Sequence, residues 1–435
     1  MAIIAPFRGL TYNYYVRRDF ENLIAPPYDV ISEQDQKEYY QTDPYNVIRL
    51  ILAKKKTGDS DWDNRYTRAA ETFRRWESAD ILRRTAKPSM YLTSLTYDPG
   101  RGLPRRTRWG FVALVRIEDE GSGVILPHER TFSRHKEDRL KLMRASSAQF
   151  SQVFGVYEDP DMPALNACRR AIEGVDPELE FESRDGETHR MWILENPFLF
   201  KEVAYVLKDK TIFIADGHHR YETTRNYRDI MRARYGRRPE NRSYEFVMIY
   251  LANMSDEGMT ILPTHRVITS VPGFDAARFL ETMKQWFIVE EMPFGSALDQ
   301  DCSALRDSLA EKGEENSVFA LYPARSEVCY ILTLKTGARG EMGDDLHPSL
   351  QKLDVLVLSR FALQKGLGFS REDLDDEKLI YYESNMETAV ERVQSGEFDV
   401  AFLLNPTKIS HVKEIASNGL VMPRKSTFFY PKIPT

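Results

Sequence analysis

Cysteine is scarce in this sequence. Cys168, Cys302 and Cys329 are the only three in 435 residues, and they lie far apart. No CxxC pair and no Cys/His spacing typical of a zinc site is present. An odd number of scattered thiols argues against a disulfide framework, so we expect three small, buried, apolar side chains.

Long apolar runs are also absent. No stretch approaches the roughly 18 uninterrupted apolar residues that a membrane-spanning helix needs. The N-terminal segment MAIIAPFRGLTYNYY has a short apolar start but neither a basic n-region nor a long h-region, so it is not expected to be a signal peptide. The sequence therefore predicts a cytoplasmic protein with no membrane partner.

Neither sign of charge dominates. The chain has 60 basic and 66 acidic residues, for a formal net charge of -6. A dedicated duplex-DNA binder usually shows a clear basic excess. Nucleic acid is therefore not an expected partner, although residues 225–242 form a locally basic stretch.

Four familiar catalytic patterns are missing. The sequence has no GxxxxGK[ST] P-loop, no GxGxxG after a strand, no HExxH and no GxSxG. Any phosphate site must therefore be built by a less common scheme.

The composition is that of a folded globular protein. Hydrophobic residues make up 42% and charged residues 29% of the chain. The alternation of strand-like and helix-like segments predicts an α/β protein with mixed sheets. We expect an N-terminal catalytic α/β domain over residues 1–270, a smaller α/β unit over 271–340 and a C-terminal α/β unit over 341–435. The Gly- and charge-rich residues 336–345 are the linker candidate.

Local signals are clear in the N-terminal half. Residues 89–98 and 108–119 alternate with period two on either side of a Pro/Gly/Arg loop, which predicts a hairpin. Residues 61–79 have the spacing of an amphipathic helix. Ser32 is a predicted helix cap.

The segment from Ile214 to Arg220, IADGHHR, carries the strongest chemical signal. An apolar strand delivers the chain to Asp216, Gly217 permits a tight turn, and a helix then begins. Such a helix start attracts anions, and His218, His219 and Arg220 add donors for phosphate or carboxylate oxygens. Asp216 is a candidate Mg²⁺ ligand or proton acceptor. The structural alternative is a capped helix whose histidines bond nearby carbonyls.

Three further segments are candidates. Residues 127–131, PHERT, place His128, Glu129 and Arg130 directly after an apolar strand, either as a substrate or phosphate site or as a solvated charged loop. Asp29 follows a rigid double proline and is either a base or metal ligand or an ordinary helix-start residue. Residues 422–432, MPRKSTFFYPK, offer Lys425 and Ser426 to phosphate or form a C-terminal strand with an exposed lysine.

These motifs resemble a known family. PFRGLTYN, IAPPYDVI, DPYNVIRL, LPHERTF, FIADGHHRYET, LPTHRVI and MPRKSTFFYPK occur in one order from Pro6 to Lys432. Together they look like domain-of-unknown-function family 1015, a name that implies no function.

A more distant likeness concerns the turn alone. Its strand–Asp-Gly-His-His-Arg–helix pattern is similar to the signature of the ParB/sulfiredoxin-like fold, which includes free serine kinases. The likeness implies a ParB/sulfiredoxin-like N-terminal part, with Gly217, His218, His219 and Arg220 against phosphate, Asp216 near a metal and Asp29 as the base. Sulfiredoxin chemistry needs a cysteine in this turn, where the sequence has His218 and His219, so sulfinic acid reduction is not expected.

The leading hypothesis is therefore an ATP- or ADP-dependent kinase of a small hydroxylated metabolite, with free L-serine as the best guess. Phosphoryl transfer depends on positioning and charge neutralisation. The predicted parts are Mg²⁺ on Asp216, cations at Arg220, Arg130 and Lys425, and a base at Asp29 or Glu129.

Two other classes stay open. A nucleotide-binding regulator of the ParB kind would need a helix-turn-helix and a basic face, and neither is evident in the sequence. A metal-dependent phosphodiesterase or nuclease would use His218 and His219 and would hydrolyse without an acceptor. The oligomeric state cannot be read from the sequence.

Overall fold

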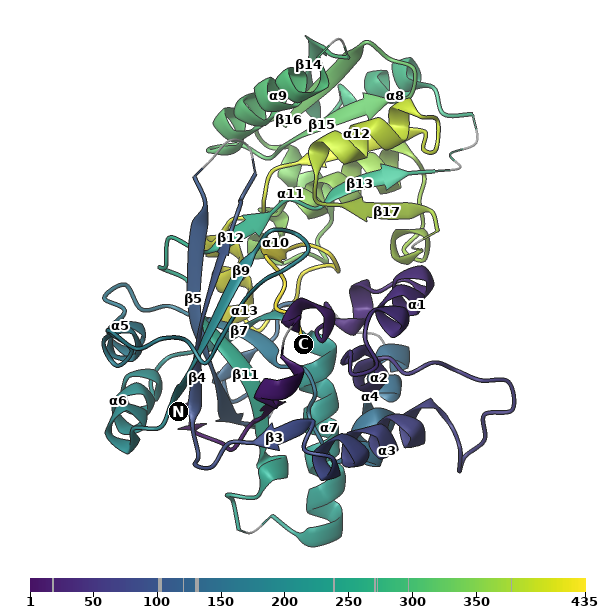
Figure 1. Ribbon diagram of the computed structural model, residues 1–435. Coiled ribbons are helices and arrows are strands. Elements are labelled where there is room, and N and C mark those ends of the chain that lie inside the picture. Colours follow the sequence, from purple (N-terminus) through teal and green to yellow (C-terminus); the bar gives the residue numbers. More distant parts are fainter. Residues whose placement is uncertain are drawn as a thin grey trace. The chain divides into compact units, whose positions relative to one another are not determined.

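The computed structural model describes residues 1–17, 19–100, 104–119, 121–129, 133–237, 239–269, 271, 273–295, 297–376 and 378–435, with residues 133–135 described by their backbone alone. The chain forms two compact units, shown in Figure 1. Unit 1 comprises Met1–Thr260 together with Pro431–Thr435, and unit 2 comprises Ile261–Tyr430. The chain thus leaves unit 1 after Thr260 and returns to it for residues 431–435.

Unit 1 is built on a nine-stranded mixed sheet with the order β6-β10-β7-β11-β5-β4-β9-β8, and β1 pairs with β5. Its strands are β1 (Ile4–Ala5), β4 (Met90–Tyr97), β5 (Arg106–Arg116), β6 (Ile125–Leu126), β7 (Val153–Tyr157), β8 (Leu179–Glu182), β9 (Thr188–Leu194), β10 (Ile212–Asp216) and β11 (Phe246–Asn253). A separate ribbon pairs β2 (Leu10–Tyr12) with β3 (Leu82–Arg84). The helices are α1 (Glu33–Thr42), α2 (Ile48–Ile51), α3 (Arg65–Ser78), α4 (Ser133–Ser146), α5 (Pro163–Arg170), α6 (Pro197–Leu207) and α7 (His218–Tyr235).

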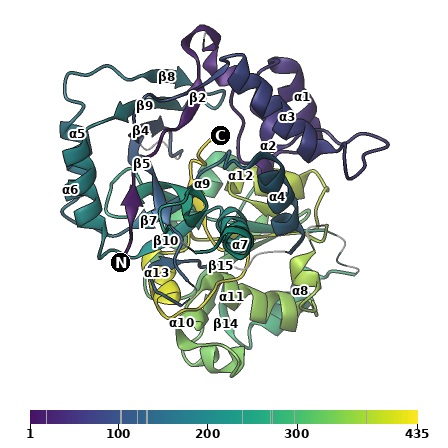
Figure 2. The same ribbon diagram turned by 90° about the horizontal axis from the view of Figure 1, so that it is seen from below.

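The two faces of this sheet are covered differently. One face buries Leu92, Phe111 and Ile249 in a core that includes side chains of α5 and α6. The helices α1 and α3 lie on the other side of β4 and β5, as Figure 2 shows. Alternation along each strand sends successive side chains to opposite faces, so both faces of the central strands carry apolar residues.

Local sequence signals account for several of these elements. Ser32 caps α1 in a capping box with Asp35, as expected. Asn64 caps α3 in the same way, and Ala70, Phe73 and Trp76 form its buried face. The predicted hairpin is the antiparallel pair β4–β5, with Ser94 opposite Trp109.

Unit 2 contains a six-stranded sheet with the order β14-β16-β15-β18-β13-β17 and a two-stranded ribbon β12–β19. The strands are β12 (Thr260–Leu262), β13 (His265–Ile268), β14 (Phe287–Pro293), β15 (Val318–Pro323), β16 (Val328–Leu334), β17 (Ile380–Glu383), β18 (Val400–Leu404) and β19 (Phe428–Tyr430). The helices are α8 (Ala276–Met283), α9 (Leu298–Gly313), α10 (Pro348–Gln351), α11 (Asp354–Val357) with the π-helical continuation Leu358–Gly366, α12 (Met386–Gln394) and α13 (Ile409–Ser417).

This two-unit division differs from the three expected parts. The strands β15 and β18 are hydrogen-bonded neighbours, so residues 271–340 and 341–430 share one sheet. The linker candidate at 336–345 contains a 3-10 helix whose Ala338 and Met342 are buried in the unit 2 core. Strand pairing between distant segments outweighs the local Gly- and charge-rich signal, because burial of the shared sheet joins both segments into one core.

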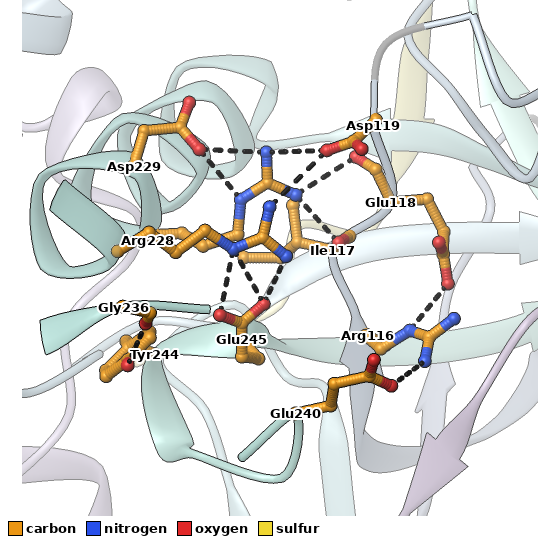
Figure 3. A network of polar contacts seen from close by, with 11 residues as sticks. Arg116, Ile117, Glu118, Asp119, Arg228, Asp229, Gly236, Glu240, Tyr244 and Glu245 are labelled. Atoms are coloured by element: carbon orange, nitrogen blue, oxygen red, sulfur yellow. Dashed lines mark hydrogen bonds and ion pairs between the residues drawn. The ribbon is translucent and has the colours of Figure 1, made fainter. Parts of the chain in front are cut away.

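The far end of α7 is held by a network of ion pairs, drawn in Figure 3. Glu245, with 1% of its surface exposed, accepts hydrogen bonds from Arg232. Arg228 is also buried; it donates to the carbonyl of Ile117 at 2.8 Å and pairs with Asp229 at 2.9 Å. Side chains of α7 are thereby tied to the end of β5 and to the segment before β11.

Three expectations from the sequence can be compared with the structure. Cys168, Cys302 and Cys329 are all free and buried, as the sequence predicts. In the part of the chain that the structure describes, no helix is both long enough and apolar enough to cross a bilayer. The expected mixed α/β class is confirmed.

Candidate functional site

The strand–turn–helix predicted around Gly217 is present. The buried strand β10 ends at Asp216, and α7 begins at His218. Gly217 is the N-cap residue and has φ 86° and ψ 31°, a left-handed conformation that glycine adopts without a steric penalty. The carbonyl of Gly217 accepts the first helical hydrogen bond from the Tyr221 N–H, at 2.9 Å. The first amides of a helix have no partner within the helix and point at the turn.

The sheet brings a second predicted segment to this turn. The strands β6 and β10 are parallel, with Phe213 opposite Leu126. Their carboxyl ends therefore lie at the same edge of the sheet, and His128 follows β6 at that edge. The rings of His128 and His218 are edge-to-face with centroids 4.7 Å apart, and the backbone N–H of His128 donates to His218 Nε2 at 3.3 Å.

Asp216 is held between two cations. Its Oδ2 accepts a hydrogen bond from Arg220, one helical turn further along α7. Its Oδ1 accepts one from Lys432, which arrives with the last residues of unit 1. The side chains of Asp216, Arg220 and Lys432 are 13%, 11% and 22% exposed, so water screens these pairs only partly.

Arg220 folds back over the turn. Its Nη1 donates to the carbonyl of Gln152, between α4 and β7. A Cβ atom on residue 217 would lie 2.8 Å from Arg220 Nε, closer than van der Waals contact allows. The guanidinium can therefore lie against the turn only because residue 217 has no side chain.

The pKa values at this edge follow from burial and from these cations. Burial opposes ionisation of Asp216, but Lys432 and Arg220 outweigh it and hold the pKa of the carboxyl well below its usual range. Burial lowers the pKa of His128 to about 3. Burial, and then the neighbouring His128, lower the pKa of His218 well below its ordinary value. At neutral pH, both buried imidazoles are uncharged and Asp216 is ionised.

A second group of polar residues adjoins the turn. Tyr28, Arg139, Arg220 and Thr224 line a small cavity of about 50 Å³. The guanidinium carbon of Arg139 lies 3.9 Å from the centre of the Tyr28 ring. Burial raises the pKa of the Tyr28 hydroxyl to about 12, so this group is a neutral phenol at neutral pH.

The predicted site residues fall into three groups. Asp216, Gly217, His218, His219 and Arg220 share the turn, and His128 meets them there. Glu129 follows His128 and is half-buried, whereas Asp29 is exposed in a 3-10 helix beside Tyr28. Arg130 lies outside the described residues. Lys425 and Ser426 belong to unit 2, where the Ser426 hydroxyl donates to the carbonyl of Pro423 at 2.6 Å; their role as phosphate ligands stays a prediction.

The sequence reasoning missed Lys432 as a partner of Asp216. The C-terminal motif was a candidate, but the cation chosen from it was Lys425. Both lysines belong to the same C-terminal motif, and the fold distinguishes them. Gln152 and Tyr28 were missed as well, because a backbone carbonyl and a buried phenol carry no sequence signal of their own.

The turn does not fit a protein-held Mg²⁺ ion in this arrangement. Mg²⁺ prefers oxygen ligands, but both oxygens of Asp216 accept hydrogen bonds from cations, and His128 and His218 at this turn offer imidazole nitrogens. The described residues include no group of three or more His, Cys, Asp or Glu side chains placed to hold a metal. A metal role for Asp216 stays a prediction.

Fold and site together define a mixed α/β protein with a cationic strand–turn–helix at one edge of its larger sheet. Residues 4–356 match the model of the family described as protein of unknown function DUF1015, and the chain belongs to that family. No curated protein matches its sequence.

Six solved chains are similar to part of this one, and three of them are described here. A conserved hypothetical protein from Pyrococcus furiosus is 14% identical, with a TM-score of 0.32, over 72% of this chain and 91% of that one. A free serine kinase in complex with AMP is 14% identical, with a TM-score of 0.33, over 70% and 83%. SbnI with a C-terminal truncation, from Staphylococcus aureus, is 11% identical, with a TM-score of 0.34, over 74% and 84%. Scores this low carry no functional argument.

Proposed function

We propose that unit 1 is a nucleotide-dependent phosphotransferase that binds the phosphates of ATP or ADP at the turn from Asp216 to Arg220. The observation that carries the proposal is the convergence of Arg220 and Lys432 on one carboxylate at the start of α7. His128 and His218 are neutral, and Asp216, Arg220 and Lys432 together carry one excess positive charge. The helix start adds amide donors and a favourable dipole for an anion.

In the proposed reaction, a hydroxyl oxygen of the acceptor attacks the terminal phosphorus. A new P–O bond forms, the bridging P–O bond to the nucleotide breaks, and the shortened nucleotide leaves with the electron pair. The proton of the hydroxyl passes to a carboxylate, for which Asp29 and Glu129 are the candidates. Arg220 and Lys432 would stabilise the charge on the transferring oxygens, a role that suits preorganised cations in a site with little water.

The acceptor would be a small hydroxylated metabolite, and free L-serine is the first to test. D-Serine tests stereochemistry, and L-alanine tests the need for the hydroxyl. Nucleotide hydrolysis that is independent of any acceptor would favour the phosphodiesterase alternative.

The test is a thermal-shift titration with ATP, ADP, CTP and AMP, with and without Mg²⁺. A ligand at 100 times its Kd stabilises the folded state by about 2.7 kcal/mol. We expect ATP or ADP to raise the melting temperature of the wild type, and Arg220→Gln and His219→Ala to reduce this shift.

Arg170→Gln is the matched control, because Arg170 is an exposed arginine of α5 that pairs only at the surface, 3.4 Å from Glu202. The proposal fails if no nucleotide stabilises the wild type, or if Arg170→Gln and Arg220→Gln reduce the shift equally. A serine-dependent phosphate-transfer assay follows a positive result.

A further inference from the structure

Unit 1 contains a second, much larger cavity of about 840 Å³. Its floor is the face of the nine-stranded sheet opposite α5 and α6, with Val112 and Leu114 of β5 and Met248 of β11. Its other walls include Leu50 and Phe73, which belong to the N-terminal helical layer. A cavity of this volume suits a drug-sized organic molecule.

The strand residues on this floor are apolar but not fully covered. The strand β5 is central in the sheet, between β4 and β11. Phe111, Ala113 and Val115, which point to the opposite face, are 0% exposed. Val112 and Leu114 alternate with them along the strand and are only partly buried. Because apolar side chains at the centre of a sheet normally pack against another layer, their exposure marks a space that an apolar ligand can fill.

Most charged side chains in the lining of the cavity are engaged by other groups. The glutamate partners are Glu178 for Arg17, Glu77 for Arg84, Glu180 for Arg190 and Glu187 for His189. The fully buried Arg108 donates to the carbonyl of Pro431 at 2.8 Å. It also interacts electrostatically with Asp256 and Tyr250.

Arg8 is the remaining charged side chain among the described lining residues. It donates to the carbonyl of Thr85 at 2.7 Å and is exposed, so water screens its charge. The described lining includes no aspartate or glutamate side chain that could hold a cation. An ionic group buried there without a partner would cost free energy. The cavity therefore favours a ligand without charge.

Aromatic and methionine side chains are numerous in the lining. The phenylalanines are Phe7, Phe20, Phe73, Phe150 and Phe181, and the methionines are Met143, Met191, Met231 and Met248. Aromatic side chains gain from packing against another ring, and thioether sulfurs make favourable contacts with ring edges. A ligand with an aromatic body would thus bind these walls better than a saturated ligand of the same size.

We propose that this cavity binds a neutral organic molecule with an aromatic body. This binding site goes beyond the proposed phosphotransferase function and does not depend on it. The cavity lies next to the turn, because its lining shares Met143, residues 148–150 and Thr224 with the small cavity that Arg220 lines. The nucleoside of ATP is therefore the competing occupant that the experiment has to distinguish.

The test titrates the full chain into N-phenyl-1-naphthylamine, a neutral aromatic probe, and measures the fluorescence of the probe. Its sulfonated analogue, 8-anilinonaphthalene-1-sulfonate, has the same rings and a negative charge. We expect the neutral probe to bind at least tenfold more tightly than the sulfonate. Equal or tighter binding of the sulfonate would overturn the neutral site.

A matched pair of alcohols tests the preference for an aromatic body. Calorimetry compares naphthalen-2-ol with decahydronaphthalen-2-ol, which has the same carbon skeleton without the aromatic rings. We expect naphthalen-2-ol to bind at least threefold more tightly. Equal affinity of the two alcohols would contradict the role of the aromatic and methionine side chains.

Three variants locate the probe. Leu114→Trp and Met191→Trp each place an indole in the cavity, from β5 and β9 respectively, and should weaken probe binding at least tenfold. Val175→Trp adds the same side chain at a position that is 56% exposed and outside the lining, and should leave binding unchanged. The melting temperature of each variant reports whether it is folded. Unchanged probe binding in either folded cavity variant would refute the location.

The two proposed sites are separable in the same experiment. Arg220→Gln should leave the affinity for the probe unchanged, so a failed nucleotide site does not remove the aromatic site. Saturating ATP should leave the probe bound in the wild type. Displacement of the probe by ATP in the wild type but not in Arg220→Gln would instead assign the cavity to the nucleoside and overturn the proposal.

Discussion

Gly217 has to satisfy two requirements that are usually met by different residues. Its φ of 86° lies in the left-handed region, and the Arg220 guanidinium occupies the space that a side chain would need. Gly337, the N-cap of the 3-10 helix Ala338–Met342, shares only the first requirement, since its φ of 88° is also left-handed and nothing lies within 4 Å of its would-be Cβ. Gly217 and Gly337 are thus a matched pair of glycines.

We expect Gly337→Ala to lower the free energy of unfolding by about 1–2 kcal/mol, the cost of a left-handed alanine. Gly217→Ala should cost more, because Arg220 must also move away from Asp216. Urea unfolding of both variants measures the difference. Equal losses would contradict the close packing of Arg220 on the turn.

The two buried histidines predict a pH dependence of stability. The folded-state pKa of His128 is about 3, against about 6.5 in an unfolded chain, and that of His218 is lowered in the same direction. Below about pH 6.5 the two imidazoles bind protons in the unfolded chain. In the folded protein they stay neutral at this pH, because burial lowers their pKa values. The free energy of unfolding should therefore fall on acidification, by up to about 1.4 kcal/mol per pH unit for each histidine.

The measurement is urea unfolding between pH 7.5 and 5. His128→Gln should remove one histidine's share of the slope. Asp216 does not interfere in this window, because its depressed pKa supports stability above about pH 4 and the loss comes only at lower pH. An unchanged slope in His128→Gln would show that His128 titrates normally in the folded protein.

At the scale of elements, α7 is fixed at both ends by different chemistry. The turn holds its start, and the carboxylate of Glu245 holds Arg232 near its end. Arg232→Met would leave Glu245 buried without its partner, and we expect a loss of about 3–5 kcal/mol in the free energy of unfolding. Arg170→Met removes an exposed pair with Glu202 and should cost about 0–1 kcal/mol. Similar losses in both variants would mean that the Glu245 network is no tighter than a surface pair.

The elements around the site show what a sequence can and cannot reveal. The strand β10, the glycine turn and α7 were predictable, because an apolar run, a glycine and a helical pattern stand next to one another in the chain. The meeting of His128 with His218 depends on the parallel pairing of β6 and β10, which no local pattern encodes. The same holds for β15 and β18, whose pairing joins segments that were expected to be separate units.

At the scale of the whole molecule, unit 2 interrupts unit 1. Its first and last strands, β12 and β19, pair with each other, so the two ends of the segment come together. We expect residues 261–430, expressed alone, to unfold in one cooperative transition, because the segment has its own sheet and core. Circular dichroism on heating measures this.

The matched control is the shorter fragment 341–430, which corresponds to the C-terminal unit expected from the sequence. It contains β18 but not its partner β15, so we expect no cooperative transition. A cooperative transition in the short fragment and none in the long one would reverse this domain division.

The position of Lys432 in the chain has a consequence for synthesis. A ribosome makes residues 1–260 first. Lys432, which pairs with Asp216, and the carbonyl of Pro431, which accepts a hydrogen bond from Arg108, are made only after the whole of unit 2. A nascent chain whose translation stops or shifts frame within unit 2, or that is cleaved there, therefore lacks both Lys432 and Pro431. A chain in which Lys432 pairs with Asp216 must have been translated through residue 432. The presence of this ion pair therefore shows that the whole of unit 2 has been synthesised.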